Sequence, residues 1–263
     1  MPPVALTIAG SDPGGAAGIQ ADLKTFHAFA VYGASVVTAL TAQDTTAVHA
    51  IADVDPSFVG VQLDAVLGDL PVAAAKTGML GRAAVVEVVA ARLTAHPLRY
   101  LVVDPVLIAT GGQRLTDPAA TELLRRTLLP LATLVTPNLL EAAALTGRPV
   151  RDLADMRDAA RALVDLGARA ALVTGGHLPG PPVDVLFAAG ALRELEGSRI
   201  GATATHGTGC TLSAAITAGL ARGLSLDDAV ARARRYVRHA LESAPALGRG
   251  HRPLNHLVNP DGQ

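Results

Sequence analysis

The chain has 263 residues, a formal net charge of -1, a hydrophobic fraction of 50% and an aromatic fraction of 3%. The apolar fraction excludes a disordered chain, and the near-zero charge with few aromatic rings excludes a nucleic-acid-binding surface. The single cysteine excludes an internal disulfide and a cysteine-based zinc cluster, which indicates an intracellular protein. No apolar stretch reaches membrane-spanning length and no basic segment precedes the first apolar run. We therefore expect a cytoplasmic protein without a membrane span or signal peptide.

Short apolar runs alternate with stretches of helical periodicity along most of the chain. The apolar runs predict strands over residues 4–9, 35–40, 73–77, 99–104, 131–136 and 170–174. Helical periodicity predicts helices over residues 18–30, 56–67, 83–93, 118–129 (N-cap Asp117) and 155–166. The last third predicts a hairpin of strands over residues 183–188 and 191–196, then amphipathic helices over 208–222 and 226–243. The alternation predicts one α/β domain over residues 1–263, with a central, mostly parallel sheet and helices on both faces.

The common nucleotide-binding and hydrolase motifs are absent from the sequence. A Walker A loop needs Gly-Lys-Ser/Thr, but Lys24 follows Leu23 and Lys76 follows Ala75. No strand is followed by G-x-G-x-x-G, and no G-x-S-x-G is present. A phosphate or nucleophile site in this chain must therefore use other residues.

The first strand ends in a glycine-rich turn that runs from Gly10 to Gly18 and leads into a helix. Glycines there let a ligand approach the backbone closely, and a helix N-terminus favours anionic or polar partners. A tight surface turn without a ligand explains the same residues. The segment alone does not separate the two interpretations.

The strongest local signal is Thr205-His206-Gly207-Thr208-Gly209-Cys210 at the start of a predicted helix. Small residues at a helix start leave backbone N–H groups directed at a phosphate. A thiol in that first turn is expected to have its thiolate favoured by the helix dipole. The alternative is that Cys210 is only a small buried apolar residue, which is the usual habit of a lone cysteine.

Two other strand ends carry oxygen ligands. Asp104 ends the apolar Leu/Val strand, while Asn138 and Glu141 lie at the next strand-to-helix turn. Together they form an edge suited to Mg²⁺ and its water shell. Alternatively, Asp104 simply ends its strand, and Asn138 caps the helix with Glu141 as its capping-box partner. The spacing of the histidines at 177, 206, 251 and 256 matches no metal-ligand pattern.

In their order along the chain, these motifs resemble the hydroxymethylpyrimidine/phosphomethylpyrimidine kinases of thiamine biosynthesis, a family of the ribokinase-like superfamily. The similarity runs from Leu6 to His256 and includes LTIAGSD, TAQDT, KTGML, VVDPV, TPNLLEA, THGTGCTLSAAI and GHRPLNH. The resemblance implies a ribokinase-like fold, usually a homodimer. It also implies an enzyme that phosphorylates an aminopyrimidine alcohol with Mg²⁺ and ATP, then phosphorylates the monophosphate to the diphosphate.

The resemblance also assigns roles to residues. Gln43 would bind the aminopyrimidine, whose ring nitrogen and amino group suit a carboxamide. The rest of that pocket would comprise Asp22, Gly10, Met79 and Val106. Cys210 would be the base, and the anion hole would be formed by Gly207, Thr208 and Gly209. Asp104 and Glu141 would serve Mg²⁺, and the ATP phosphates would contact Asn138, Thr174 and Thr208.

One position departs from the family. Members commonly carry lysine before Gly-Gly-His, whereas this chain has Thr174, which can donate a hydrogen bond but brings no charge. Two alternatives stand beside the kinase of thiamine biosynthesis. One is a pyridoxal or pyridoxine kinase, because ribokinase-like enzymes with the cysteine motif can accept vitamin B6 compounds. The other, which Thr174 suggests, is a pyrimidine-binding protein with weakened catalysis.

Overall fold

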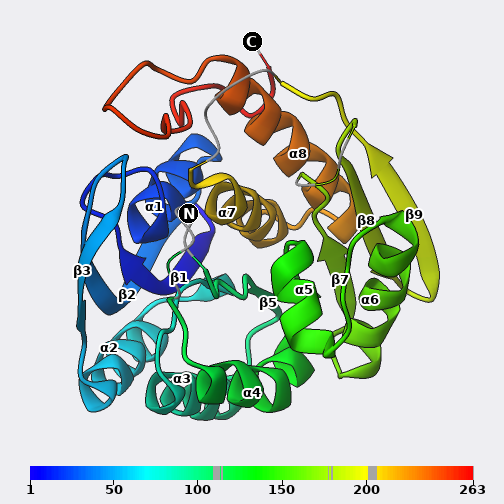
Figure 1. Cartoon of the computed structure of the whole chain (residues 1–263). Helices are drawn as coiled ribbons and strands as arrows, with labels where there is room; N and C mark the ends of the chain where they lie inside the picture. Colours follow the sequence, from blue (N-terminus) through cyan, green and yellow to red (C-terminus); the bar gives the residue numbers. More distant parts are fainter. Residues whose placement is uncertain (109–112, 114, 177, 179, 201–205, 263) are drawn as a thin grey trace.

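All strands join one sheet in the order β3-β2-β1-β4-β5-β6-β7-β8-β9 (Figure 1). The structure is a computed structural model that describes residues 1–108, 113, 115–176, 178, 180–200 and 206–262, so His177 and Thr205 lie outside the described residues. The strands are β1 (Val4–Ser11), β2 (Tyr32–Gln43), β3 (Val48–Asp53), β4 (Val72–Thr77), β5 (Tyr100–Val103), β6 (Leu134–Val135), β7 (Ala170–Val173), β8 (Val183–Ala188) and β9 (Ala191–Glu196). Strands β2, β1 and β4 to β7 are parallel, while β3, β8 and β9 are antiparallel edge additions.

Helices cover both faces of the sheet, as the sequence predicts (Figure 1). One face is covered by α2 (Pro56–Asp69), α3 (Ala83–Ala95), α4 (Pro118–Thr127), the short 3₁₀ helix η1 (Leu129–Leu131), α5 (Leu139–Thr146) and α6 (Leu153–Asp165). The other face is covered by α1 (Gly18–Ala28), α7 (Thr208–Ala221) and α8 (Leu226–Glu242). The central strands are buried on both sides, which explains their continuous Val, Leu and Ala sequence.

Local signals determine where several helices begin. The Asp117 carboxylate accepts a hydrogen bond from the Ala120 N–H at 2.6 Å, which confirms the predicted N-cap of α4. Asp152 and Ser225 cap α6 and α8 in the same way. None of the helices in the described part of the chain is long and apolar enough to cross a membrane.

The sequence misjudged some strand lengths. The predicted strand over residues 131–136 is only Leu134–Val135, because η1 ends at Leu131 and a bend separates it from the strand. β2 is longer than expected, since it continues past the core to pair with β3 (Val48–Asp53). The sequence does not predict β3, because its residues are mostly exposed and their sequence, VHAIAD, lacks the regular apolar alternation of a half-buried strand.

The segment after α8 returns across the molecule to brace the start of α7. The Thr211 hydroxyl and the His256 Nε2 lie 3.0 Å apart, and the Tyr236 hydroxyl donates to the His256 carbonyl at 3.1 Å. Burial and the positive charge of Lys24 lower the pKa of His256 to about 4. The folded chain therefore holds this imidazole neutral.

We predict that this histidine makes stability fall in mild acid. In the unfolded chain, His256 takes up a proton below its ordinary pKa of 6.5, whereas in the folded chain it does so only near 4. Between these values the unfolded state binds more protons, so the free energy of unfolding should fall as pH falls, by at most about 1.4 kcal/mol per pH unit. Urea unfolding at several pH values measures this slope.

The matched variant is His256→Gln, which keeps a hydrogen-bonding group but does not titrate. Its unfolding free energy should fall less steeply than that of the parent between pH 6.5 and 4. Equal slopes for the two chains would contradict the assignment.

Candidate active site

Strand β1 is where the chain changes the side on which it adds further strands to the sheet. The chain passes from β1 to β2 on one side and, after β3 and α2, returns to β4 on the other. In open α/β sheets, ligands bind outside the carboxyl ends of the strands at such a point. The glycine-rich turn after β1 and the start of α7 meet there, because a Cβ on Gly207 would lie 1.8 Å from the carbonyl oxygen of Ala16. Position 207, with φ +83°, therefore admits only glycine without movement of the backbone.

The N-terminus of α7 has no side-chain cap among the described residues. Gly207 occupies the N-cap position. The first-turn N–H groups of a helix have no intrahelical acceptor, and the helix dipole adds partial positive charge there. Thr208, Gly209 and Cys210 form that first turn, so the predicted anion hole and the predicted base are adjacent.

A buried lysine lies beneath this helix start. The Lys76 ammonium, at the end of β4, lies 2.9 and 3.0 Å from the two carboxylate oxygens of Asp22 and 3.8 Å from Asp104. The side chains of Lys76 and Asp22 are both 0% exposed. Burial alone would lower the pKa of Lys76, but the carboxylates of Asp22 and Asp104 raise it, so the lysine stays charged.

The expected thiolate character of Cys210 is wrong for the chain without ligands. Burial raises the pKa of the thiol to about 12, and the negative charges of Asp104 and Asp22 add to this effect. The charge of Lys76 and the N–H of Gly18 act in the opposite direction but do not overcome it. The helix dipole therefore loses to desolvation, and the thiol is protonated at neutral pH.

The Asn138 and Glu141 side chains form the capping box that the sequence offered as an alternative. The Asn138 oxygen accepts from the N–H groups of Leu140 and Glu141, and Glu141 Oε2 accepts from the Asn138 N–H at 2.9 Å. The other oxygen of Glu141 lies 3.4 Å from the Leu107 nitrogen. Asn138 and Glu141 are thus held rigidly at the start of α5.

The donor set at this edge fits a divalent cation. Burial, and then the negative charge of Asp104, raises the pKa of Glu141 to about 8, so the two buried carboxylates repel each other. A cation between them would remove that repulsion. The buried hydroxyls of Thr77 and Thr136 have no hydrogen-bond partner among the described residues. No group of three or more His, Cys, Asp or Glu in the described chain is placed to hold a metal ion.

Gln43, at the end of β2, is held by a histidine from the other end of the chain. Its amide nitrogen lies 2.9 Å from His206 Nε2, and the same ring nitrogen lies 3.4 Å from an oxygen of Asp12. Asp12 is buried and organises the glycine-rich turn, because its oxygens accept from the N–H groups of Gly14, Ala16 and Ala17.

The other residues expected in the substrate pocket lie in different environments. Gly10 and Met79 are in contact, since a Cβ on Gly10 would lie 2.8 Å from the terminal methyl of Met79, and Val106 is half-buried after β5. Asp22, in contrast, is fully buried, with its oxygens bonded to Lys76 and to the Thr7 hydroxyl at 2.6 Å. Its contacts indicate that it positions Lys76, and its contact with substrate stays a prediction.

Thr174 lies beside Asn138, as expected for two residues at neighbouring strand ends. The two form a parallel bridge, and the Thr174 N–H donates to the Pro137 carbonyl at 2.9 Å. The position thus belongs to the same edge of the sheet as Asp104 and Glu141, but it carries no positive charge.

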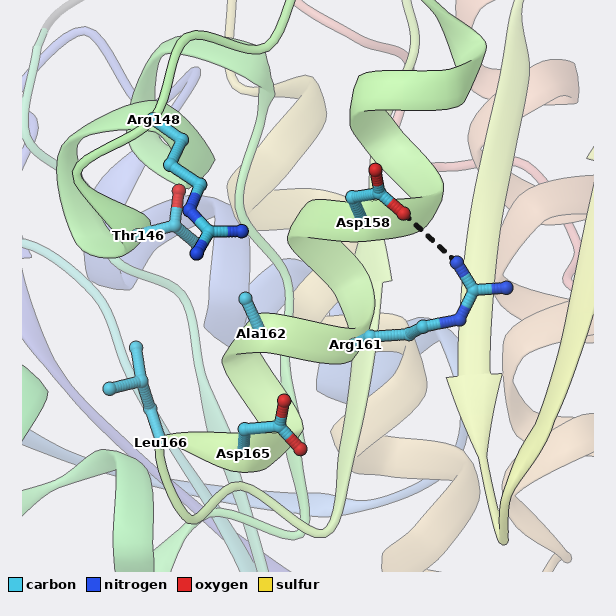
Figure 2. Close-up of a pocket in the computed structure, with 7 residues that line it drawn as sticks. All are labelled: Thr146, Arg148, Asp158, Arg161, Ala162, Asp165 and Leu166. Carbon is cyan, nitrogen blue, oxygen red and sulfur yellow. Dashed lines mark hydrogen bonds and ion pairs between the residues drawn. The ribbon is translucent and has the colours of Figure 1, made fainter.

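A separate groove of about 540 Å³ lies between the end of α5 and α6, lined by Thr146, Arg148, Asp158, Arg161, Ala162, Asp165 and Leu166 (Figure 2). Thr146 is the last residue of α5, whereas the capping box is at its first turn. The groove is therefore at the opposite end of α5 from the candidate site.

Three residues of the site escaped the sequence analysis: Lys76, Asp12 and His206. Lys76 had been considered only as a missing Walker lysine, although a lysine in an otherwise apolar strand is itself a signal of a buried ion pair. Asp12 sits in the glycine-rich turn, where an aspartate commonly accepts local N–H groups. His206 lies in the motif at the start of α7, but the sequence assigns it no role beyond excluding a metal-ligand spacing.

The fold and site define the chain as an α/β kinase of small molecules. Its structure is similar to the ADP complex of Bacillus subtilis pyridoxal kinase, with a TM-score of 0.92 and 38% identity, over 97% of this chain and 98% of that chain. The family described as phosphomethylpyrimidine kinase matches residues 12–255, and this chain belongs to that family.

Curated relatives agree with this assignment. The hydroxymethylpyrimidine/phosphomethylpyrimidine kinase of Rhizobium meliloti is 50% identical over 98% of this chain and 98% of its own length. The thiamine biosynthesis bifunctional protein of Geobacter sulfurreducens is 52% identical over 96% of this chain, which spans about half (52%) of that protein.

We predict that Lys76 carries a large share of the stability of the site. Lys76→Met would leave the Asp22 carboxylate buried without its cation, so the free energy of unfolding should fall by about 3–5 kcal/mol. Urea denaturation measures this loss.

The only other lysine supplies the control. Lys24 is exposed, and Lys24→Met should cost about 1 kcal/mol or less. Adding Asp22→Asn to Lys76→Met should restore part of the lost stability, and strict additivity of the two changes would contradict the ion pair.

Proposed function

We propose that this chain uses ATP to phosphorylate 4-amino-5-hydroxymethyl-2-methylpyrimidine on its hydroxymethyl group, and then phosphorylates the monophosphate to the diphosphate. The observation that carries this proposal is that the start of α7 and Gln43 lie at the same edge of the sheet. The start of α7 stands over the buried Lys76, and Gln43 ends the strand beside β1. Membership of the phosphomethylpyrimidine kinase family supports the substrate.

In this proposal, Gln43 binds the pyrimidine edge. A carboxamide offers one acceptor and two donors, which complements an amino group next to a ring nitrogen. Met79 and Val106 pack against the ring, and Gly10 lets Met79 approach the backbone, since a Cβ there would lie 2.8 Å from the terminal methyl of Met79. The ring is thereby oriented before reaction, which is the main demand of phosphoryl transfer.

The start of α7 stabilises the transferred phosphoryl group. The N–H groups of its first turn point at developing negative charge, and no reorganisation is needed because Gly207 is locked against Ala16. Asp104 and Glu141 would hold Mg²⁺ through its water shell, with Asn138 and Thr174 beside the ATP phosphates. When bound, Mg²⁺ supplies charge neutralisation at these phosphates.

Cys210 is the proposed acceptor of the hydroxyl proton, with Lys76 as the cation that favours its thiolate. Because its pKa in the chain alone is about 12, this role requires the charge around the thiol to change when substrates bind. A loose transition state also reduces the need for a strong base.

A pyridoxal kinase activity is the second candidate. It is favoured by the structural similarity to Bacillus subtilis pyridoxal kinase, at a TM-score of 0.92. The two candidates differ in the ligand edge that Gln43 must recognise.

We predict a two-step product series. Purified protein is incubated with MgATP and either the hydroxymethylpyrimidine or pyridoxal, and the products are weighed. The pyrimidine should gain one and then two phosphoryl groups of about 80 Da each. Phosphorylation of pyridoxal alone would overturn the proposal in favour of the second candidate, and the absence of any product would favour a binding protein.

We further predict that Cys210→Ala lowers kcat by about 10²-fold, in line with the loss of a general base. Cys210→Ser separates two roles, because a serine hydroxyl keeps a hydrogen-bonding group but is a much weaker acid. If the thiolate is the base, Ser should be as slow as Ala in steady-state assays. Near-parental turnover in both variants would remove Cys210 from the mechanism.

A further inference from the structure

The contact between Gln43 and His206 is a hydrogen-bond contact, so it constrains how both side chains are oriented. Gln43 Nε2 and His206 Nε2 are 2.9 Å apart, the histidine is 9% exposed, and the two residues are 163 positions apart in the chain. Two nitrogens at this distance can bond only if one donates and the other accepts. An amide nitrogen only donates, so with Gln43 Nε2 turned toward the ring, His206 Nε2 is the acceptor of this bond.

Asp12 contacts the same imidazole ring. Asp12 lies farther from the same ring nitrogen, at 3.4 Å, and its two oxygens already accept from the N–H groups of Gly14, Ala16 and Ala17. Against the effect of burial, the imidazole of His206 also lowers the pKa of Asp12, so it interacts with the turn as well as with Gln43. Its contact with Gln43 is the shorter of the two.

The other side of the Gln43 amide is held only weakly. The Thr41 hydroxyl lies 3.3 Å from Gln43 Oε1 and 3.0 Å from the Ser11 carbonyl oxygen. A hydroxyl has one hydrogen, and the carbonyl can only accept, so the shorter bond to Ser11 takes it. Gln43 Oε1 thus remains available as an acceptor, while Nε2 is turned toward His206.

We propose that His206 is a positioning residue that determines substrate preference by fixing the orientation of the Gln43 amide. The proposal rests on the proposed function. With Nε2 held by His206, Oε1 accepts from the substrate's amino group, and the second amide hydrogen is left for the ring nitrogen. Without His206, the amide can rotate by half a turn and present a donor to the amino group, which binds poorly.

The test compares two ligands that differ only in this group: the aminopyrimidine alcohol and its analogue without the amino group. The preference is the ratio of their kcat/KM values, measured for the parent, His206→Phe, Gln43→Leu and the double variant. His206→Phe should reduce the preference by about tenfold or more, as expected for a lost polar contact at a specificity site. Because both residues act through one amide, the double variant should lose no more than Gln43→Leu alone.

A conservative variant separates positioning from structural support. His206→Gln keeps an oxygen that can accept from the Gln43 amide, so it should retain most of the preference. Thermal unfolding monitors the fold of each variant, and His206→Leu provides the same test if the phenylalanine ring is not accommodated. An unchanged preference in a folded variant without the histidine nitrogen, or fully additive losses in the double variant, would overturn the proposal.

Binding without ATP keeps this result separate from the proposed function. Titration calorimetry of both ligands gives the preference as a ratio of dissociation constants. If the parent binds the aminopyrimidine but does not phosphorylate it, the proposed function fails, while the effect of His206 on the ratio is still decided. If the parent does not bind it, both proposals are overturned.

Discussion

The buried ion pair of Lys76 and Asp22 joins the elements that build the site. Asp22 comes from α1 and Lys76 from the end of β4, and Asp104, after β5, lies 3.8 Å from the same ammonium group. Ser213, on α7, donates to Asp104 at 2.9 Å. These contacts hold two strands and two helices in fixed positions around the Lys76 ammonium group. They thereby also fix the position of the start of α7.

Charge around this cation is unbalanced in the chain alone. Lys76 faces Asp22, Asp104 and the Cys210 thiol, and Glu141 adds a further carboxylate that Asp104 disfavours as an anion. Unpaired negative charge in a buried site is costly, so such an arrangement is most stable when positive charge arrives with a ligand. The protonated state of Cys210 is one response to this imbalance, because it keeps one more anion from forming.

Local sequence patterns were sufficient to predict the α/β fold, whereas contacts between residues far apart in the chain determine the charge states in the candidate site. Asp117 and Asn138 were recognisable as helix caps because their partners lie within three residues. The pairing of Lys76 with Asp22 spans 54 positions, so the apolar strand around Lys76 indicates a buried ion pair but not which carboxylate is its partner. The pKa of Cys210 was misjudged for the same reason, since the helix dipole is a local property, whereas burial and neighbouring charges arise only from tertiary packing. The resemblance suggested the site residues but not their protonation states.

The C-terminal segment packs closely against the turn that follows Gln43. The N–H groups of Arg249 and Gly250 donate to the Thr45 hydroxyl at 3.1 Å, a contact between residues up to 205 positions apart. A Cβ on Gly250 would lie 2.0 Å from the Thr45 carbonyl oxygen, so the fit tolerates no side chain. Contacts of such sequence separation form late, because the loop that they close must first be ordered. During synthesis, the end of the site that contains Gln43 therefore stays incomplete until Arg249 and Gly250 have left the ribosome.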